Sequence, residues 1–417
     1  MAHLIIVWGL WGPYHCRRLV ALRDYASKTG DSVTGISLFE GSRVNHWRSS
    51  TLPQGVTHIN LGSDETRLPF SGLKTLLTLP KRLGADVALL PAYFHWSLIL
   101  NMGTRLAGGR VVMMNDTHAG TARARGLKMA FKRRIVSSFH AGFVAGAPQK
   151  RYFSSLGLSA DKIVTGYDAV DNDYFASRTD EVKREAPALR SHYDLPEHYF
   201  LNLGRFVAKK NLGTLIRAYR LFLDASERKE THLVLVGSGE EESKLRTLCG
   251  ELRLPIYDHP PGSLKKYNAV AAGVHFYGFR QIDESPIFYG LADAFILPSF
   301  YEEWGLVVNE AMACGLPVIV SRTAGCAEDL LETGVPGESL NGEAAAIGQL
   351  RLESLVRQNG FVFEPESTEE LSRVMRCLAE NPKFGLRMGT ESRRIVEKFS
   401  CQNFAKNALQ AARLAIQ

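Results

Sequence analysis

The 417-residue sequence lacks several features that define other classes of protein. None of its six cysteines forms a C-x-x-C pair, which indicates neither a zinc knuckle nor a disulfide framework, so we expect reduced thiols of a cytosolic protein. No apolar run reaches the roughly 18 residues that span a bilayer. Residues 1–7 have no basic segment and are expected to form a strand, not a signal peptide. Hydrophobic residues at 45% and charged residues at 22% exclude a disordered or fibrous chain.

Acidic residues are scarce in the first part of the chain. Residues 1–150 contain 19 Lys/Arg but only 7 Asp/Glu, whereas residues 151–417 contain 31 and 36, within an overall net charge of +7. This excess of positive charge predicts an anionic partner for the first half. Nucleic acid, a phospholipid head group and a phosphorylated substrate all satisfy that requirement.

Short apolar runs alternate with helical patterns in both halves of the sequence. Continuous runs of this kind between helices are typical of buried parallel strands. The sequence therefore predicts two doubly wound, Rossmann-like α/β domains that face each other across a cleft, with ligands bound at the carboxyl ends of the strands. We expect an N-terminal domain at 1–180, a linker at 181–199 and a C-terminal domain at 200–398. Two stretches, 255–272 and 332–357, break the pattern and are expected to be surface insertions.

Cationic residues and glycines follow two expected strands of the second domain. Arg205 and Lys210 come after the strand at 200–203, at a strand-to-helix junction where backbone N–H groups and the helix dipole favour anions. We interpret them as a clamp for a diphosphate, the alternative being a solvated basic turn. Gly237 and Gly239 close the next strand, where glycine lets a phosphate or sugar approach the backbone. An ordinary tight turn is the alternative for this pair.

The most informative segment is 298–320, which predicts a strand, a polar loop, a helix and another strand. Glu302 lies on the loop and Glu310 on the helix, with seven residues between them, so both can face one pocket. Carboxylates accept pairs of hydroxyl donors, which suits ribose and hexose rings. Gly305 and Leu306 would expose N–H groups at the helix start. The alternative for Glu302 is a purely electrostatic preference for the helix N-terminus.

This segment resembles the E-x7-E signature of the family 4 retaining glycosyltransferases (glycosyl transferases group 1), which have the GT-B fold. The resemblance covers almost all of 200–400 and, more loosely, 1–175. It implies transfer of a hexose from a nucleotide sugar, with UDP-sugar favoured and GDP-mannose second. The implied acceptor is a glycolipid, a polysaccharide or a small molecule. The resemblance also implies that the final helix, 399–417, crosses back to the first domain.

The resemblance assigns roles to single residues. Arg205 and Lys210 would hold the donor diphosphate and stabilise the leaving group, and Glu302 would hold the transferred sugar. His118 would lie near the anomeric carbon, where we consider it as a general base, the alternative being a structural or sugar-binding histidine. The implied catalytic set is His118, Arg205, Lys210 and Glu302, and the implied donor-binding set is Gly12, Gly237, Gly239, Gly278, Phe279, Arg280, Gly305, Leu306, Val307 and Glu310.

Fixed cations at the diphosphate lower the barrier to its departure and can take the place of a metal. We therefore expect no cofactor and no metal, only the nucleotide-sugar donor as co-substrate. Asp171 and Asp173 have the D-x-D spacing of a metal site, but their position in the connector argues against that role. A front-face mechanism is expected, since no carboxylate is clearly placed as a nucleophile.

A basic stretch without any acid lies between Thr117 and Ala160. Its cations are interleaved with apolar residues, as in a helix on anionic lipid, and a solvated helix face is an equal alternative. We expect a cytoplasmic enzyme, peripheral on the inner face of the cell membrane, with no nucleic-acid partner. A GT-B sugar-nucleotide epimerase, a nucleic-acid-binding protein and a non-catalytic nucleotide-sugar sensor remain as alternatives. The basic residues that we assign to this surface are Arg123, Arg125, Lys128, Lys132, Arg133 and Arg134.

Overall fold

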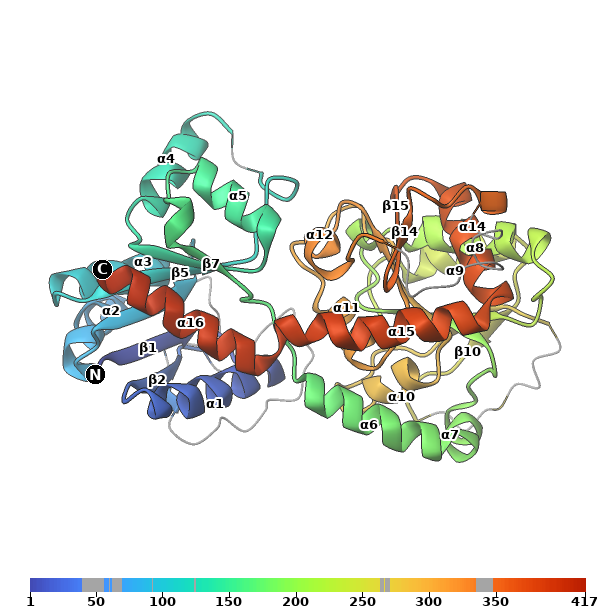
Figure 1. Cartoon of the computed structure of the whole chain (residues 1–417), viewed down its shortest axis with the longest axis horizontal. Helices are drawn as coiled ribbons and strands as arrows, with labels where there is room; N and C mark the ends of the chain where they lie inside the picture. Colours follow the sequence, from blue (N-terminus) through green and yellow to red (C-terminus); the bar gives the residue numbers. More distant parts are fainter. Residues whose placement is uncertain are drawn as a thin grey trace. The chain divides into compact units, whose positions relative to one another are not determined.

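The computed structural model describes residues 1–39, 56–59, 61, 70–91, 93–123, 125–262, 266, 271–334 and 348–417. These residues form two compact units. The first consists of residues 1–171 and 398–417, and the second of residues 172–397. Each unit is built around one largely parallel sheet with helices beside it, so the two doubly wound α/β domains predicted from the sequence are confirmed (Figure 1).

The sheet of the first unit reverses its strand order beside its first strand. Such a switch point is where open parallel sheets bind ligands, at the carboxyl ends of the strands. In spatial order the strands are β3 (Val56–His58), β2 (Ser32–Ser37), β1 (His3–Trp8), β4 (Val87–Pro91), β5 (Arg110–Asn115), β6 (Ala141–Val144) and β7 (Ile163–Thr165), all paired in parallel. The helices are α1 (Pro13–Lys28), α2 (Phe70–Leu83), α3 (His95–Leu106), α4 (Leu127–Val136), α5 (Ala147–Ser155), η1 (Ala160–Lys162) and α16 (Cys401–Ile416).

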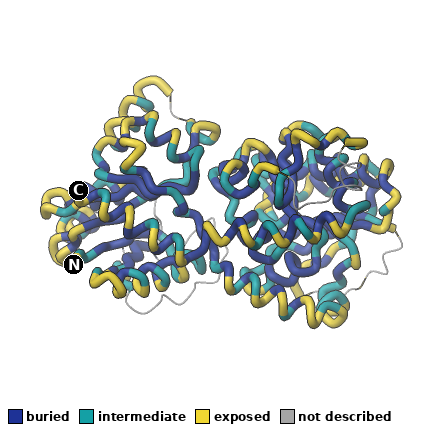
Figure 2. The backbone as a smooth tube through the Cα atoms, in the orientation of Figure 1, coloured by how far each residue is buried: buried dark blue, intermediate teal, exposed yellow. Residues whose placement is uncertain are grey.

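Both faces of this sheet are buried, which explains the unbroken apolar runs. Leu4 and Ile6 of β1 belong to the core that α1 and α16 cover, and Ile5 belongs to the core on the opposite face. Phe404 of α16 lies in the same core as Leu4. The strands accordingly form the buried interior in Figure 2, with exposed residues on the outer surfaces of the helices.

The sheet of the second unit repeats the doubly wound order, with its reversal between β8 (Tyr199–Leu203) and β12 (Ala294–Leu297). In spatial order the strands are β10 (Ile256–Asp258), β11 (Val274–Phe276), β9 (His232–Val236), β8, β12, β13 (Val318–Ser321), β15 (Gly360–Phe363) and β14 (Val356–Arg357), of which β14 pairs antiparallel with β15. The helices are α6 (Asn172–Arg184), α7 (Ala186–Tyr193), η2 (Ala208–Lys210), α8 (Leu212–Ala225), α9 (Glu242–Glu251), α10 (Ser285–Gly290), α11 (Leu306–Ala313), α12 (Ala327–Leu330), α14 (Thr368–Glu380) and α15 (Pro382–Val396), with η3 (Glu397–Phe399) following.

Three expected irregular stretches contain regular structure. The segment expected as a linker, 181–199, holds the end of α6 and all of α7, inside the second unit. The expected loop 255–272 begins with β10, which pairs with β11. The stretch 332–357 ends in β14, and its residues 335–347 lie outside the described part of the chain. Among the helices described, none is both long and apolar enough to cross a bilayer.

Candidate functional site

The loop after β8 is fixed to the end of β12 by Asn211. Its side-chain amide donates to the carbonyl oxygens of Pro298 at 3.0 Å and Pro365 at 2.7 Å. Its φ of 55° lies in the left-handed region, which Asn tolerates better than most residues. Because Asn211 follows Lys210 directly and precedes α8, it fixes the preceding lysines at the carboxyl edge of the sheet, beside the switch point.

Two lysines and two glutamates meet at this edge. The Lys210 ammonium is paired with the Glu302 carboxylate. Lys209 Nζ lies 3.3 Å from Glu302 Oε1 and 2.7 Å from Glu303 Oε2, and Ser299 Oγ donates to Glu302 at 3.3 Å. The structure thus brings together Lys210 and Glu302, which the sequence predicted as partners in one site. Lys209 was assigned no role, although the doubled Lys-Lys and Glu-Glu pairs signalled a larger charge cluster.

The charges of this cluster support one another. Burial by itself raises the pKa of Glu302, but Lys210 and Lys209 outweigh it and hold that pKa below its usual value. Burial likewise opposes the charge of Lys209, yet Glu302 and Glu303 raise its pKa above the usual value. The cluster therefore keeps fixed charges of both signs at a partly buried sheet edge, where electrostatic interactions are stronger than in water.

The helix that follows Glu302 begins with an open N-terminus. Gly305, at a φ of 110°, is its N-cap and offers no side chain, and the amides of Leu306 and Val307 have no acceptor among the described residues. About one turn further along, Glu310 is only 2% exposed, and Tyr289 OH donates to its Oε2 at 2.9 Å. Helix N-termini of this kind attract anions and hydroxyl oxygens. Tyr289 is a partner of Glu310 that sequence spacing did not reveal.

Arg205 and two glycines lie where the loops after β8 and β9 touch. Arg205 is exposed, and its guanidinium has no partner among the described residues. A Cβ on Gly237 would meet the Gly204 carbonyl oxygen at 1.9 Å, and one on Gly239 would meet the Phe206 carbonyl oxygen at 2.4 Å. Close packing between the two loops therefore explains both glycines by itself. No bound phosphate is needed to explain them.

The segment after β11 is held by its own side chains. Arg280 donates to the carbonyl oxygens of Tyr277 at 3.1 Å and His259 at 2.9 Å, and its side chain is only 10% exposed. Gly278 has a φ of 67°, and Phe279 is half-buried. Arg280, expected near the nucleotide base, thus fixes the conformation of the segment through backbone contacts.

The first loop of the first unit contains Gly12, which is bonded to a neighbouring histidine. Its N–H donates to His15 Nδ1 at 3.0 Å, and the His15 ring lies 4.6 Å from the ring of Trp8. Burial, with a smaller effect of Arg18, lowers the pKa of His15 to about 3, so the ring stays neutral. A Cβ on Gly12 would find its nearest atom 3.9 Å away, so packing within this unit does not require glycine there.

His118 follows β5 at the carboxyl edge of the first sheet and is buried. The Gly120 N–H donates to His118 Nδ1 at 3.2 Å. Since a neutral imidazole carries one proton, that proton then lies on Nε2. In this arrangement Nε2 is a hydrogen-bond donor, whereas a general base needs an unprotonated nitrogen.

Five of the six assigned cations of the basic stretch are exposed, and we call them the outer cations; the sixth, Lys132, is partly buried. Lys132 turns inward: its ammonium donates to Tyr152 OH at 2.8 Å and lies 4.4 Å from the centre of the Tyr93 ring. The expectation that Lys132 belongs to an exposed basic face is therefore wrong, because its ammonium packs between two tyrosines. The exposed cations are Arg123, Arg125, Lys128, Arg133 and Arg134.

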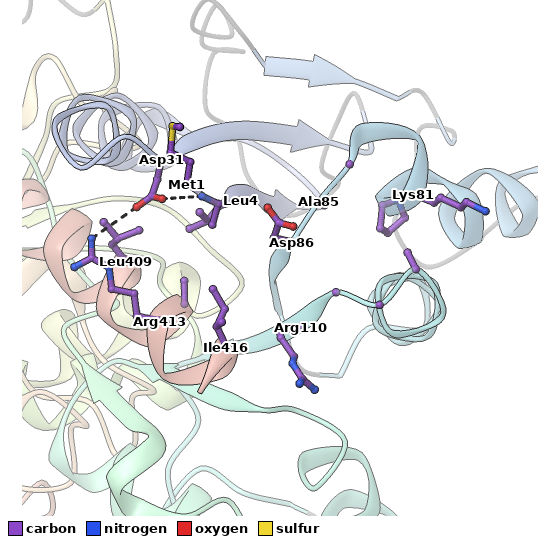
Figure 3. A pocket seen from close by; sticks show the side chains of 17 residues that line it. Met1, Leu4, Asp31, Lys81, Ala85, Asp86, Arg110, Leu409, Arg413 and Ile416 are labelled. Carbon is purple, nitrogen blue, oxygen red and sulfur yellow. Dashed lines mark hydrogen bonds and ion pairs between the residues drawn. The ribbon is translucent and has the colours of Figure 1, made fainter.

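A cavity of about 700 Å³ lies at the opposite edge of the first sheet, beside the strand beginnings (Figure 3). Asp31 accepts a bond from the Ala2 N–H at 2.8 Å and lies 3.7 Å from Arg413. Asp86 accepts from the His3 N–H at 2.7 Å. Both acids of the cavity are thus bonded to neighbouring groups of the protein. The cavity also lies at the opposite edge from the carboxyl ends of the strands, where ligands of such sheets bind, so it is separate from the candidate site.

Comparison with known proteins gives consistent relatives. The family described as "Glycosyl transferases group 1" matches residues 197–381. An uncharacterized glycosyltransferase of Methanocaldococcus jannaschii is 28% identical over 225 residues, 53% of this chain and 46% of that protein. A GDP-mannose-dependent alpha-(1-6)-phosphatidylinositol monomannoside mannosyltransferase of Mycolicibacterium smegmatis is 29% identical over 224 residues, 50% of this chain and 52% of that protein. The chain thus spans about half the length of the curated relatives it matches.

The fold has relatives along its whole length. The crystal structure of Anabaena HepE in complex with UDP and glucose superposes with a TM-score of 0.67 at 15% identity, covering 99% of this chain and 100% of that one. The sequence match lies in the second unit, which holds the cluster of Lys210 and Glu302, and the structural match covers both units. Residues 197–381 are thus similar to the glycosyl transferases group 1, and the chain as a whole has the fold of the GT-B glycosyltransferases.

Proposed function

We propose that the protein is a retaining hexosyltransferase that takes a sugar from a nucleotide donor and passes it to a glycan, lipid-linked or small-molecule acceptor. The observation that carries this proposal is the pairing of Lys210 with Glu302 at the switch point of the second sheet. A cation suited to a diphosphate and a carboxylate suited to sugar hydroxyls there share one site. The open N-terminus of α11 and buried Glu310 follow Glu302 directly in the chain.

The chemistry follows from charge. Cleaving the bond between the sugar and the nucleoside diphosphate leaves negative charge on the phosphate and positive character on the anomeric carbon. Arg205 and Lys210 would stabilise the departing diphosphate, which lowers the barrier through preorganised electrostatics. In the proposed reaction Lys210 exchanges its contact with Glu302 for one with the diphosphate, and Glu302 becomes available to a sugar hydroxyl. We assign no metal or other cofactor to this step.

His118 is proposed as a sugar- or acceptor-binding donor and not as the general base. This follows from the bond of Gly120 to Nδ1, which leaves the proton on Nε2. Steady-state kinetics of His118→Ala test the assignment. A rise in KM with kcat nearly unchanged agrees with a binding role, whereas a large fall in kcat alone restores His118 to the chemistry.

We propose a UDP-sugar as the donor, with GDP-mannose as the second candidate. The Mycolicibacterium relative is named as GDP-mannose-dependent, and the Anabaena structure contains UDP. A thermal-shift panel of UDP, GDP and ADP decides, because a ligand that binds only the native state raises its stability. We expect one nucleotide to raise the melting temperature of the wild type but not of Lys210→Ala. No shift with any nucleotide or nucleotide sugar contradicts the proposal, and donor turnover without acceptor favours the epimerase.

We further propose that the first unit binds an anionic membrane from the cytoplasmic side. Asp116 is the only acid between residues 87 and 160. Leu127 and Phe131 of α4 are 90% and 65% exposed beside the outer cations, and Leu106 of α3 is 74% exposed. A groove of about 540 Å³ between α3 and α4 is lined by both apolar residues and arginines. Large exposed apolar side chains among cations suit a phospholipid surface better than water or nucleic acid.

Vesicle co-sedimentation at about 150 mM salt, where surface charges are screened beyond roughly 8 Å, tests this surface. We expect binding to vesicles that contain an anionic phospholipid and little binding to neutral ones, since each nearby Lys or Arg contributes about 1 kcal/mol. Phe131→Ser should weaken binding. Equal behaviour with anionic and neutral vesicles, or no binding to either, would contradict the membrane proposal without affecting the glycosyltransferase proposal.

A further inference from the structure

Three buried histidines form a hydrogen-bonded row in the second unit. His275 Nε2 lies 2.8 Å from His232 Nδ1, and His275 Nδ1 lies 2.9 Å from His259 Nε2. His232 is 8% exposed, His275 2% and His259 4%. They come from β9, from β11 and from the residue after β10, so the row crosses three adjacent strands. We call these three residues the histidine row.

A backbone N–H at one end of the row favours one arrangement of its protons. The Gly273 N–H also points at His232 Nδ1, at 3.4 Å, which makes that nitrogen an acceptor. His275 must then donate from Nε2 and accept at Nδ1, and His259 must donate from its own Nε2. Each neutral ring carries a single proton, so the two ring–ring hydrogen bonds couple the tautomers of the three rings. A row of this kind constrains ring orientation more strongly than apolar packing does.

The row ends against the segment expected to hold the nucleotide base. The His259 ring stacks on Tyr277 with a centroid distance of 4.4 Å and an angle of 11°. Tyr277 OH donates to the carbonyl oxygen of Asp194 at 2.8 Å. Arg280 bonds the carbonyl oxygens of both His259 and Tyr277. Any tilt of the His259 ring is therefore transmitted to the backbone from Tyr277 to Arg280.

The same segment reaches the glycine loop after β9. The Gly237 N–H donates to the Gly278 carbonyl oxygen at 2.8 Å, and that loop contacts the backbone just before and after Arg205. The histidine row is thus connected by short contacts to residues 277–280, whereas Lys210 and Glu302 are held by other partners, namely Asn211 and the strand end at Pro298. The base-facing segment and the Lys210–Glu302 pair therefore have separate supports, whereas Arg205 lies between them.

We propose that the histidine row is a positioning element that sets residues 277–280 for the nucleoside part of the donor. This inference rests on the proposed function, and none of the three histidines needs to touch the donor. It predicts that breaking the row weakens recognition of the nucleoside and leaves recognition of the diphosphate intact.

The test compares ligands with and without a nucleoside on His275→Phe, which keeps a flat ring and removes both hydrogen bonds. Isothermal titration calorimetry of the full chain gives Kd for UDP, GDP and inorganic pyrophosphate. We expect the preferred nucleoside diphosphate to bind about tenfold more weakly, because displaced residues 277–280 would lose about one hydrogen bond of ordinary strength to the nucleoside. Pyrophosphate should bind nearly as to the wild type, because Lys210 is held through Asn211 and not through the row.

Two further variants complete the design. His198→Phe lies in the same unit but outside the row, 3.3 Å from Asp293, and should change neither Kd. His232→Phe breaks only the bond at the far end of the row, so it should show a smaller selective loss and replaces His275→Phe if that variant fails to fold.

The outcomes separate the two proposals. An equal loss for pyrophosphate and the nucleoside diphosphate, or no loss for either, overturns the positioning role while the proposed function stands. If the wild type binds none of the three ligands, the proposed function fails and the positioning role fails with it.

Discussion

Acidification should destabilise the second unit because the histidine row is held neutral there. Burial lowers the pKa of His275 to about 2, with His232 and His259 adding to the effect, and burial lowers the pKa of His232 to about 4. Burial also lowers the pKa of His259, although Asp194 and Asp258 oppose it and Arg280 reinforces it. Replacing His275 by Phe removes the most strongly shifted member of the row.

The size of the effect follows from proton linkage. An unfolded histidine binds a proton below a pH of about 6.5, whereas the folded row does not, so the stabilisation is fully present above that pH and is lost as the pH falls. Each proton taken up only by the unfolded chain contributes about 1.4 kcal/mol per pH unit. Between pH values of about 7.5 and 5, His275 alone should therefore account for about 2 kcal/mol of lost unfolding free energy.

Urea unfolding of the wild type and His275→Phe at these two pH values, followed by far-UV circular dichroism, measures this contribution. Other shifted groups, such as His15 in the first unit, are present in both proteins and cancel in the comparison. The unfolding free energy of the wild type should fall by about 2 kcal/mol more than that of the variant. Equal falls would show that His275 is protonated in the folded state, or titrates there as in the unfolded chain, and would refute the reasoning.

Three other outcomes are expected. Arg205→Ala should weaken binding of UDP or GDP by roughly tenfold to a hundredfold, measured by calorimetry, because a charge-assisted bond contributes about 1.5–3 kcal/mol. Gly237→Ala should lower the melting temperature strongly, since its Cβ would meet the Gly204 carbonyl oxygen at 1.9 Å, whereas Gly12→Ala, with 3.9 Å of clearance, should leave it nearly unchanged. Lys132→Met should lower the free energy of unfolding by about 1 kcal/mol, because the bond of Lys132 to Tyr152 is lost. Vesicle co-sedimentation should be unchanged, and a loss of vesicle binding would contradict the inward placement of Lys132.

Much of the fold was predictable because buried parallel strands need continuous apolar residues. The continuous apolar runs at 4–7 and 294–297 predicted β1 and β12 correctly. The short strand β10 was missed because three residues before a Pro-Pro-Gly turn carry too little pattern to be distinguished from a loop. The helix α7 was missed for a related reason: the prolines and charges of 181–199 are typical of a linker, yet Pro187 lies in the first turn of the helix, where proline is favoured.

The candidate site was predictable at positions where chemistry and chain position coincide. Glu302 and Lys210 could be paired from the sequence because both follow strands that adjoin the switch point. Partners that come from other elements, such as Tyr289 for Glu310, could not be predicted, since no local pattern links them. The tautomer of His118 depends on the backbone of Gly120 and so also needed the structure.

The place of α16 has a consequence for how the protein is made. Phe404 and Leu409 complete the core that covers β1, and α16 lies along α1, although these partners stand at opposite ends of the sequence (Figure 1). During synthesis, residues 1–171 emerge before α16 exists, so the apolar surface that α16 covers stays exposed while residues 172–397 are made. At ordinary elongation rates this takes roughly 10–45 s. During this interval the exposed apolar surface is a binding site for chaperones. The second unit, residues 172–397, is therefore able to fold before the first unit is complete.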